Sequence, residues 1–529
     1  MSILFSCTLL VLLVPLYLYL KSSYRSKNPA ALPTNWPILH MFPSTIANLH
    51  NLHNYFSLVL AGSGHNFRAH GPPGTGMRFF ITCDPANIRH IFTTNYANFP
   101  KGVEFAAIFD IMDGSNTPLD GSIFTIDGEP ARQQRTKVKC MLSSPQSVAR
   151  MEACCRNKVE NSLLPLFTHM ASTTTVFDMQ ELMSRFMFDL AATPYFGVDP
   201  GLLSSDMLPL DALHPGNISM GMPPMDPAVA LDIVMEVAFF RHTMPTYCWK
   251  LMRWLNIGSE RKLGMAHGVL REFIVEMMEK RKIKTSRVAN DEEQECMDMI
   301  SYCLHGIGDT DDELRQAMII SFMLAARDTV GTTLSWIFYN LAQNPNIVSI
   351  IRNELSPIAS RKVEAGADGM VMFEPNDTRS LIYLRAVLYE TLRLYPPAPL
   401  ERKTVVASDI MPSGHEVHTS DIILISLHSI GRMESVWGKD CLDYNPNRWL
   451  SDNGDNLKYV PSHKFLAFNS GPRMCLGKDI AIMQMKTVIA STLWNFDMQV
   501  MEGQSIQPKP SCILKMQNGL IVKLKKRHM

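Results

Sequence analysis

The sequence lacks several patterns that would quickly assign a function. Its 11 cysteines include no Cys-x-x-Cys pair, so neither a zinc site nor a disulfide framework is indicated. Lysine and arginine total 50, and aspartate and glutamate also total 50, so the charge balance gives no reason to expect a nucleic-acid partner. No Gly-x-Gly-x-x-Gly motif occurs, and no dinucleotide or flavin fold is therefore indicated. Scattered cysteines of this kind fit a reducing, cytosol-facing compartment, where most of them are expected to be small core residues.

One long apolar run lies at the N-terminus. Residues 3–20 carry no charge and approach the roughly 20 residues that a membrane-spanning helix needs. A cleaved signal peptide would instead carry positive charge before the apolar run and small residues after it. We therefore predict an N-terminal membrane anchor helix over residues 1–22. Because Lys21, Arg25 and Lys27 follow the run, and positive residues stay cytoplasmic, we expect the rest of the chain on the cytosolic side.

Proline then marks a connector. Residues 23–44 contain prolines at positions 29, 33, 37 and 43, which break helices repeatedly and suit a stiff extended linker. Residues 45–529 show neither a second linker of this kind nor an internal repeat, and long stretches have helical periodicity. We predict one mainly α domain with small β-sheets, with strands in 77–83 and 416–427. Exposed loops are expected to begin at Asp206, Arg287 and Ser360.

A long helix is predicted from a capping box at Thr310 to Pro345, which ends it. At about 1.5 Å per residue, this helix would be on the order of 45 Å long, enough to cross a domain. Its middle contains Arg327, Asp328 and Thr329, although an unpaired buried charge costs several kcal/mol. One explanation is a polar face that reaches water. The other is a ligand beside the helix, because small residues flank the polar group and leave room.

A second polar pair precedes Pro396 on another predicted helix. Glu390 and Arg393 are neighbours on one helix face, and such a pair usually marks a solvated surface. Arg448 follows downstream between a proline and a tryptophan. Arg448 could be the second guanidinium partner, beside Arg393, of a buried Glu390 carboxylate.

The most specific stretch is FNSGPRMCLG, residues 468–477, which we call the cysteine loop. Gly471 and Gly477 bracket a lone cysteine, Cys475, and Arg473 lies between them. Glycine permits a positive φ or a close approach to a flat partner, and proline restricts φ. The sequence therefore predicts a loop of defined shape.

The pattern Phe468-x-x-Gly471-x-Arg473-x-Cys475-x-Gly477 follows a Glu-x-x-Arg pair and an Ala-Ala-Arg-Asp-Thr helix. Together these motifs resemble the cytochrome P-450 superfamily of haem-thiolate monooxygenases, and the resemblance covers almost the whole chain. It implies a mainly α fold shaped as a triangular prism, with haem b (iron protoporphyrin IX) between the long distal helix and the cysteine loop. It also implies that the Cys475 thiolate is the axial iron ligand. Phe468, Gly471 and Gly477 then belong to the haem-binding set, and both glycines let the backbone approach the porphyrin.

The same resemblance assigns a haem propionate to Arg473, with Arg135 and Lys403 as further candidates. Many members of the superfamily have a tryptophan four residues before the propionate-binding arginine that corresponds to Arg135. This chain has Ala131 at that position. One propionate contact is therefore expected to differ here.

Other residues acquire roles from the resemblance. A thiolate ligand favours cleavage of the O–O bond, and protons must then be delivered in a dry pocket. Asp328 and Thr329 match the residues that relay those protons. Glu390, Arg393 and Arg448 match a structural triad that fixes the cysteine loop and performs no chemistry.

Within the superfamily, stretches such as NFPKG and GRMESVWGKDCLDYNPNRW look like the plant clan that hydroxylates fatty acids and alkanes. The nearest resemblance is to the branch that contains mid-chain alkane hydroxylases of cuticular wax. It implies a long-chain aliphatic substrate, an alkane or a fatty acid. Some relatives in this branch couple phenols in alkaloid synthesis, so phenol coupling is an alternative, and a non-catalytic haem-binding protein is another. Apolar residues are expected to form the substrate roof: Phe105, Phe109, Met112, Ile123, Met207, Met220, Met222 and Met225.

The resemblance also implies partners. Electrons are expected from NADPH through a separate flavoprotein reductase, because this chain has no dinucleotide motif. Candidate docking residues on the cysteine side are Arg132, Lys137, Lys139 and Lys478. The remaining expectations are O₂ as co-substrate, no nucleic acid, and an endoplasmic reticulum membrane location with one N-terminal anchor and a cytosolic catalytic domain.

Overall fold

The computed structural model describes residues 40–109, 122–203, 226–288, 312–364 and 369–527. The predicted anchor and most of the predicted linker lie outside these residues. Among the described residues, no helix combines the length and apolar character needed to cross a membrane. Two compact units are formed. Unit 1 holds the described residues up to Pro100 together with Pro399–Leu442 and His463–Leu466, and unit 2 holds Lys101–Ala398, Asp443–Ser462 and Ala467 onward.

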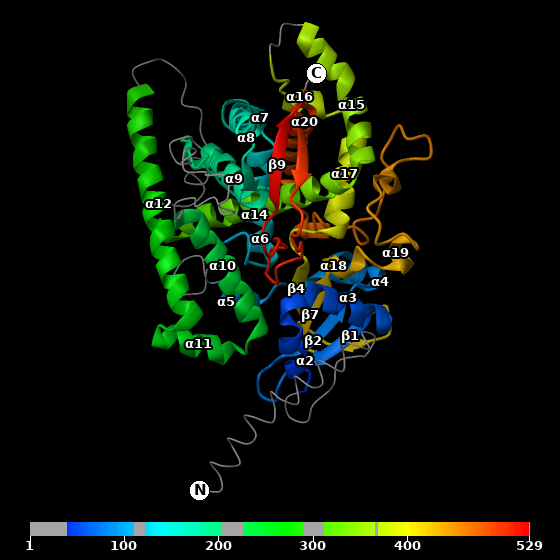
Figure 1. Cartoon of the computed structure of the whole chain (residues 1–529). Helices are drawn as coiled ribbons and strands as arrows, with labels where there is room; N and C mark the ends of the chain where they lie inside the picture. The colour runs from blue at the N-terminus through cyan, green and yellow to red at the C-terminus, as the bar shows by residue number, and fades with distance from the viewer. Residues whose placement is uncertain (1–39, 110–121, 204–225, 289–311, 365–368, 528–529) are drawn as a thin grey trace. The chain divides into compact units, whose positions relative to one another are not determined.

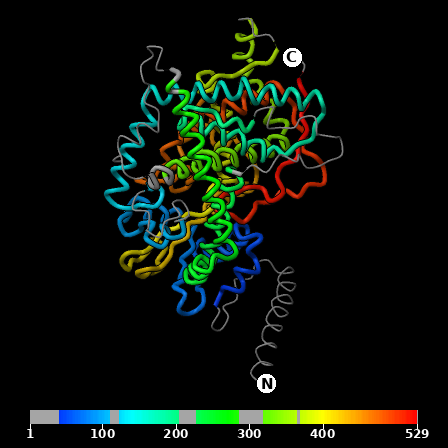
Figure 2. Tube along the Cα trace, turned by 90° about the vertical axis from the view of Figure 1, so that its left-hand side faces the viewer, coloured from blue at the N-terminus to red at the C-terminus, as the bar shows by residue number. Residues whose placement is uncertain are grey.

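Unit 1 is built on a four-stranded sheet with the strand order β1-β2-β7-β4. Strands β2 and β7 are parallel, and the outer pairs are antiparallel. Four of the five residues of β7 are buried, which fits a central strand rich in branched apolar side chains. Segments far apart in the sequence therefore lie side by side, the N-terminal strands in blue and the 399–442 segment in yellow (Figure 2).

Short helices and one hairpin complete unit 1. The predicted linker overlaps α2, which begins at Phe42. The strands are β1 (Asn66–His70), β2 (Arg78–Thr82), β4 (Leu400–Thr404), β5 (Asp409–Ile410), β6 (Glu416–Val417) and β7 (Ile422–Ser426). The helices are α2 (Phe42–Ala47), α3 (Leu52–Gly62), α4 (Pro85–Arg89), α18 (Leu427–Ile430) and α19 (Glu434–Trp437).

Unit 2 is mainly helical and surrounds one long helix, α14 (Asp312–Gln343). Helix α14 packs against α9 (Met179–Phe196), α17 (Ile382–Leu394) and α20 (Lys478–Asn495) (Figure 1). The contact with α9 is close at Gly331, where an added Cβ would lie 3.4 Å from the carbonyl oxygen of Met183. A small three-stranded sheet has the order β3-β9-β8.

The other elements of unit 2 lie before, between and after these helices. The helices are α5 (Val103–Ile108), α6 (Gly128–Leu142), α7 (Pro145–Lys158), α8 (Leu164–Ser172), α10 (Asp226–Thr243), α11 (Thr246–Leu255), α12 (Gly258–Val288), α15 (Pro345–Glu364) and α16 (Pro375–Thr378). The strands are β3 (Val176–Asp178), β8 (Phe496–Val500) and β9 (Ile521–Lys526). The expectation of a mainly α fold with small sheets is confirmed.

Several local predictions can be compared directly. The predicted strands contain β2, β6 and β7, and α14 ends one residue before Asn344, as the proline signal indicated. The predicted start of that helix, at Thr310, lies outside the described residues. The loop predicted from Ser360 is wrong at its start, because α15 continues to Glu364. The reason is the strong helix propensity of arginine, lysine and glutamate in this stretch, which no glycine interrupts.

Helix α11 presents apolar side chains to solvent. Tyr247, Leu251 and Trp254 are 60%, 54% and 80% exposed, and their spacing places them on one helix face. On the inner side Trp249 is 2% exposed, and the guanidinium of Arg241 lies 4.6 Å from its ring centroid. The helix therefore has a buried aromatic anchor and an apolar outer stripe.

Candidate functional site

The cysteine loop is a tight, internally bonded turn. The backbone N–H of Cys475 donates to the carbonyl of Phe468 at 2.8 Å. Between them Gly471 has a φ of 58° and begins a 3₁₀ turn that extends to Arg473. A positive φ suits glycine because it has no Cβ. The glycine and proline pattern thus produces the defined shape that the sequence indicated.

Cys475 is exposed to solvent, and its sulfur accepts a hydrogen bond from the backbone. The residue is exposed, yet enough protein surrounds the sulfur for desolvation to raise the pKa of the thiol. A hydrogen bond from the Gly477 backbone N–H lowers the pKa in part, and so do the charges of Arg135 and Lys478. An N–H group aimed at sulfur stabilises the thiolate form, which is the metal-binding form.

An opening in the packing occurs halfway along α14. Ala325 is exposed, and Ala326 and Thr329 are half-buried, although most residues around them are buried. The Thr329 hydroxyl donates to the Ala325 carbonyl at 2.6 Å. Among the described residues, one stretch of this central helix, lined by small side chains, is therefore left uncovered.

Asp328 belongs to an ion cluster in which Arg327 and Asp328 are buried and Asp232 and Lys515 are half-buried. Arg327 Nη1 lies 2.8 Å from Asp328 Oδ1 and 2.7 Å from Asp232 Oδ1 on α10. Lys515 Nζ lies 2.6 Å from the same Asp232 oxygen and 3.5 Å from Asp328 Oδ1. Burial alone would raise the pKa of Asp232, but Arg327 and Lys515 together hold it well below its usual range. Arg327 and Asp328 are thus paired and buried, so of the two explanations considered for them, the polar face that reaches water does not hold.

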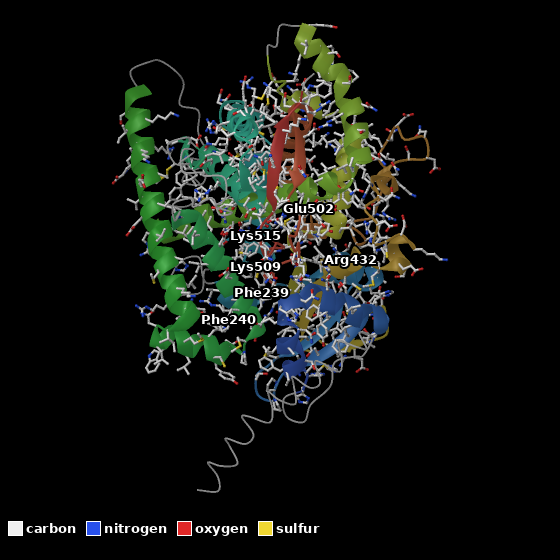
Figure 3. All side chains as sticks on the ribbon, viewed as in Figure 1. Phe239, Phe240, Arg432, Glu502, Lys509 and Lys515 are labelled. Carbon is white, nitrogen blue, oxygen red and sulfur yellow. The ribbon has the colours of Figure 1, made fainter. Side chains whose placement is uncertain are left out.

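A second ion pair joins the same two segments. Lys509 is paired with Glu236, one helical turn along α10 from Asp232. Both lysines lie beside α10, on which Phe239 and Phe240 follow (Figure 3). Residues 509–515 are therefore attached to α10 at two points.

The predicted structural triad assembles around Glu390. Arg393 donates Nε to Oε2 at 2.8 Å and Nη2 to Oε1 at 2.7 Å, and Arg448 Nε lies 3.5 Å from Oε1. The Trp449 indole N–H and the Asn445 backbone N–H also donate to this carboxylate, at 2.9 and 2.8 Å. Glu390 and Arg393 are fully buried, so a buried charge is balanced by several donors.

The predicted propionate residues have protein partners in this structure. Arg473 donates Nη2 to Asp127 Oδ1 at 2.7 Å, and Arg135 donates to the Met474 carbonyl. Lys403 lies in unit 1, where its buried Nζ is 3.2 Å from Glu401. Their roles as propionate ligands stay predictions. Ala131, which stands in place of the usual tryptophan, is buried on α6.

The residues fit the expected haem on physical grounds. The group needs an accessible thiolate donor, room for the backbone beside it, and an uncovered surface of small residues. Cys475 is exposed, and an added Cβ at Gly477 would meet nothing within 4 Å. Ala325 and its neighbours supply an uncovered surface on α14.

Sequence reasoning missed residues that only the fold brings to this site. Asp232 and Lys515 join Asp328 from distant positions, and no local signal marks them. Trp449 and Asn445 could have been found, because they flank Arg448 in the sequence. Asp127 had a weaker signal: it directly precedes α6, and aspartate is a common residue before a helix.

Similarity to known proteins covers nearly the whole chain. The model of the cytochrome P-450 family matches residues 31–524. Noroxomaritidine synthase 1 of Narcissus pseudonarcissus is 34% identical over 506 residues, which cover 96% of this chain and 93% of that protein. Alkane hydroxylase MAH1 of Arabidopsis thaliana is 33% identical over 533 residues and 99% of both chains. Cytochrome P-450 86B1 of the same plant is 32% identical over 527 residues, which cover 98% of this chain and 89% of the relative.

Proposed function

Because this chain belongs to the cytochrome P-450 family, we propose that it hydroxylates a long-chain aliphatic substrate, an alkane or a fatty acid. The enzyme class itself follows from the family: the chain is a P-450 monooxygenase. Members of this family carry a haem-thiolate group and receive electrons from a redox partner. We propose haem b as that group and an NADPH-dependent flavoprotein reductase as that partner.

The cysteine loop supplies the ligand for this group. When bound, haem-thiolate activates O₂ so that one oxygen atom enters a C–H bond. We propose Cys475 Sγ as the iron ligand. The hydrogen bond from the Gly477 backbone N–H stabilises the negative charge of its thiolate form. Arg473 and Arg135 are the proposed propionate partners in unit 2. Glu390, Arg393 and Arg448 are the proposed structural triad, which fixes the cysteine loop and does not contact the substrate.

We propose that Asp328 and Thr329 move protons. Asp328 Oδ1 is occupied by Arg327, whereas Asp328 Oδ2 is buried and has no hydrogen-bond partner among the described residues. An unpaired buried oxygen is costly, so Oδ2 is the atom we propose to take and release a proton. The Thr329 hydroxyl, which donates to the Ala325 carbonyl at the opening, is the second group that we propose for this proton relay.

The proposal of an aliphatic substrate rests on the apolar character of those predicted roof residues that the structure describes. Phe105 and Phe109 are 6% and 4% exposed, and their ring centroids are 4.6 Å apart. The full-length similarity to a protein named as an alkane hydroxylase supports the same class. The other predicted roof residues, apart from Ile123, lie outside the described residues.

Phenol coupling is the second candidate, because a noroxomaritidine synthase is at least as similar as the alkane hydroxylase. Alkaloid precursors are amines, and a protonated amine is recognised best by a carboxylate. Asp232 and Asp328 are already paired with Arg327 and Lys515. The two cations beside these acids would repel a protonated amine, so neither acid supports the second candidate.

A substrate panel tests this proposal. Purified enzyme, reductase and NADPH are incubated with alkanes, fatty acids and phenolic amines, and products are identified by mass spectrometry. Alcohol formation coupled to NADPH consumption with an alkane or a fatty acid supports the proposal. Carbon–carbon or carbon–oxygen coupling of phenols, without hydroxylated alkane, would replace it with the second candidate.

Basic residues near the cysteine loop support the choice of reductase. Lys137 and Lys139 are exposed on α6, and the same helix reaches the loop through Arg135. Arg132 is paired with Glu129 at 2.8 Å, and Lys478 lies over the Phe468 ring at 5.5 Å. We propose that an acidic reductase surface docks on this side.

We also propose attachment to the endoplasmic reticulum membrane through residues 1–22, with the catalytic domain in the cytosol. The support is the uncharged run 3–20 and the basic residues after it. Carbonate extraction and protease protection of the full chain, compared with a variant that lacks residues 1–22, test this location. Extraction of the full chain into the carbonate supernatant would contradict it.

A further inference from the structure

Segment 122–127 connects the distal helix to the cysteine loop. At one end the hydroxyls of Ser122 and Ser321 on α14 lie 3.0 Å apart. At the other end Arg473, two residues before Cys475 in the loop, donates Nη2 to Asp127 Oδ1 at 2.7 Å. The same guanidinium also donates to the carbonyl of Ile126. This short segment therefore contacts elements that we assign to opposite sides of the haem.

Asp127 also holds the start of α5. The backbone N–H of Lys101 donates to Asp127 Oδ1 at 3.1 Å, and that of Gly102 donates to Oδ2 at 2.8 Å. Lys101 and the cap residue Gly102 directly precede α5, so Asp127 fixes the backbone that leads into this helix. Both carboxylate oxygens of Asp127 are thus used: Oδ2 accepts from Gly102, and Oδ1 accepts from both Lys101 and Arg473.

Aromatic packing reinforces this connection. Phe124 lies in the segment, and its ring centroid is 5.6 Å from that of Phe105 and 4.9 Å from that of Phe109 on α5. Lys101 donates Nζ to the Phe124 carbonyl at 2.8 Å and lies 4.1 Å from the ring centroid. Helix α5, which carries the predicted roof residue Phe105, therefore packs on the same segment that binds Arg473.

Burial and charge make the Asp127 contact more than a surface ion pair. The Arg473 side chain is 4% exposed and that of Asp127 is 25% exposed. Partly buried pairs are screened less than exposed ones, and removal of one partner leaves a costly unpaired charge. A guanidinium has five N–H donors, so Arg473 can bind Asp127 and a haem propionate at once. The position of Arg473 toward the haem then depends on Asp127.

We propose that Asp127 is a positioning residue that couples the cysteine loop to α5, so that haem retention and the order of the roof helix depend on one carboxylate. The proposal rests on the function proposed above for its haem side, and it adds a connection between the substrate side and the thiolate side of that site. Coupling of this kind is reciprocal: a ligand that orders α5 strengthens the hold on Arg473, and haem at Arg473 orders α5.

The test perturbs the coupling from both ends. Asp127→Asn keeps the side-chain shape but removes the charge, and Arg473→Lys keeps the charge but removes the planar fork of donors. The control is Asp84→Asn, since Asp84 also accepts two backbone N–H groups at a helix start, from Ala86 and Asn87 in unit 1. Haem transfer from the loaded protein to apomyoglobin measures retention. Hydrogen exchange, followed by mass spectrometry, measures the order of residues 101–109.

We expect Asp127→Asn to release haem ~10-fold faster or more, because a charge-assisted hydrogen bond to Arg473 is lost. We expect Arg473→Lys, which changes no atom of α5, to raise exchange at residues 101–109 by roughly threefold or more. Asp84→Asn should leave both quantities within about twofold of the wild type, because distant sites act independently.

Two results would overturn the proposal. One is haem release from Asp127→Asn within about twofold of the wild-type rate, and the other is unchanged exchange at residues 101–109 in Arg473→Lys. The exchange measurement does not require bound haem. A wild-type chain that binds no haem would therefore refute the proposed function, while the comparison of wild type with Arg473→Lys would still decide whether the two elements are coupled.

Discussion

Replacement of one buried lysine should change the pH dependence of stability. Lys486 lies on α20, the helix that continues directly from the cysteine loop, and it is 1% exposed. Its Nζ donates to the Arg379 carbonyl at 3.3 Å. Burial and, to a smaller extent, Arg385 lower the pKa of Lys486 from 10.5 to about 7, against a partial opposing effect of Glu354. The folded protein therefore favours the neutral amine.

The sign of the effect follows from proton binding. Between about pH 7 and pH 10.5 the unfolded chain carries this proton and the folded chain does not. The free energy of unfolding therefore rises with pH across this window, by up to ~1.4 kcal/mol per pH unit from this group. Below the window both states are protonated, and the full cost of a buried ammonium remains. The difference in pKa corresponds to a cost on the order of 5 kcal/mol.

Lys486→Met removes this cost with a flexible apolar side chain of similar length. We expect the variant to unfold at a higher denaturant concentration than the wild type at pH 7, with an advantage of roughly 3 kcal/mol or more. We expect this advantage to shrink by about 3 kcal/mol between pH 7 and pH 10. Guanidinium unfolding of the haem-loaded protein at a series of pH values measures both quantities. The matched control is Lys137→Met, because Lys137 is exposed on α6.

An advantage of Lys486→Met that is the same at pH 7 and at pH 10 would refute the reasoning. Such a result would mean that the lysine is charged in the folded protein at neutral pH, with its proton stabilised by neighbours other than those named above. A loss of stability at every pH would instead show that the aliphatic stem and the bond to Arg379 outweigh the cost of burying the charge.

Four further predictions concern the site. Cys475→Ser should abolish both turnover and the carbonyl-complex band that characterises haem-thiolate proteins, because a neutral hydroxyl cannot replace the thiolate; a retained band would remove Cys475 as the ligand. Thr329→Ala should fold normally but yield ~10-fold less product per NADPH and more hydrogen peroxide, since positioned proton transfer typically contributes about 10² to 10⁴; an unchanged ratio would exclude a proton role. Glu390→Gln should lower the unfolding free energy by about 3 to 5 kcal/mol in a denaturant titration, because buried arginine loses its counter-charge; a cost under ~1 kcal/mol would contradict burial of the pair. Reversing Lys137 and Lys139 to glutamate should raise the reductase concentration needed for half-maximal rate, most at low salt; equal values at all salt concentrations would place docking elsewhere.

The local features of this chain were predictable because they depend on short sequence spacing. Glycine and proline around Cys475 indicated the shape of the cysteine loop, and Pro345 indicated the end of α14. The Glu390 and Arg393 pair is close on one helix, so its contact also follows from sequence. In each case the interacting residues are separated by one or two helical turns at most, or lie in one loop.

The long-range partners were not predictable from one sequence. Lys515 and Asp232 come from separate segments and meet Asp328 only because α10 and residues 509–515 pack beside α14. An isolated charged residue usually marks a solvated surface, so neither residue carried a signal. Asp127 was equally ambiguous, because its contact with Arg473 joins residues 346 positions apart.

The outer stripe of α11 has a practical consequence for work with this protein. Trp254 is 80% exposed, and Tyr247 and Leu251 extend the same apolar surface. A contiguous exposed patch of this kind favours self-association in water, independently of any N-terminal segment. Removal of residues 1–22 alone should therefore leave a preparation that aggregates without detergent. Leu251→Ser combined with Trp254→Ser, both far from Cys475 in the sequence, is the more direct route to a monodisperse sample.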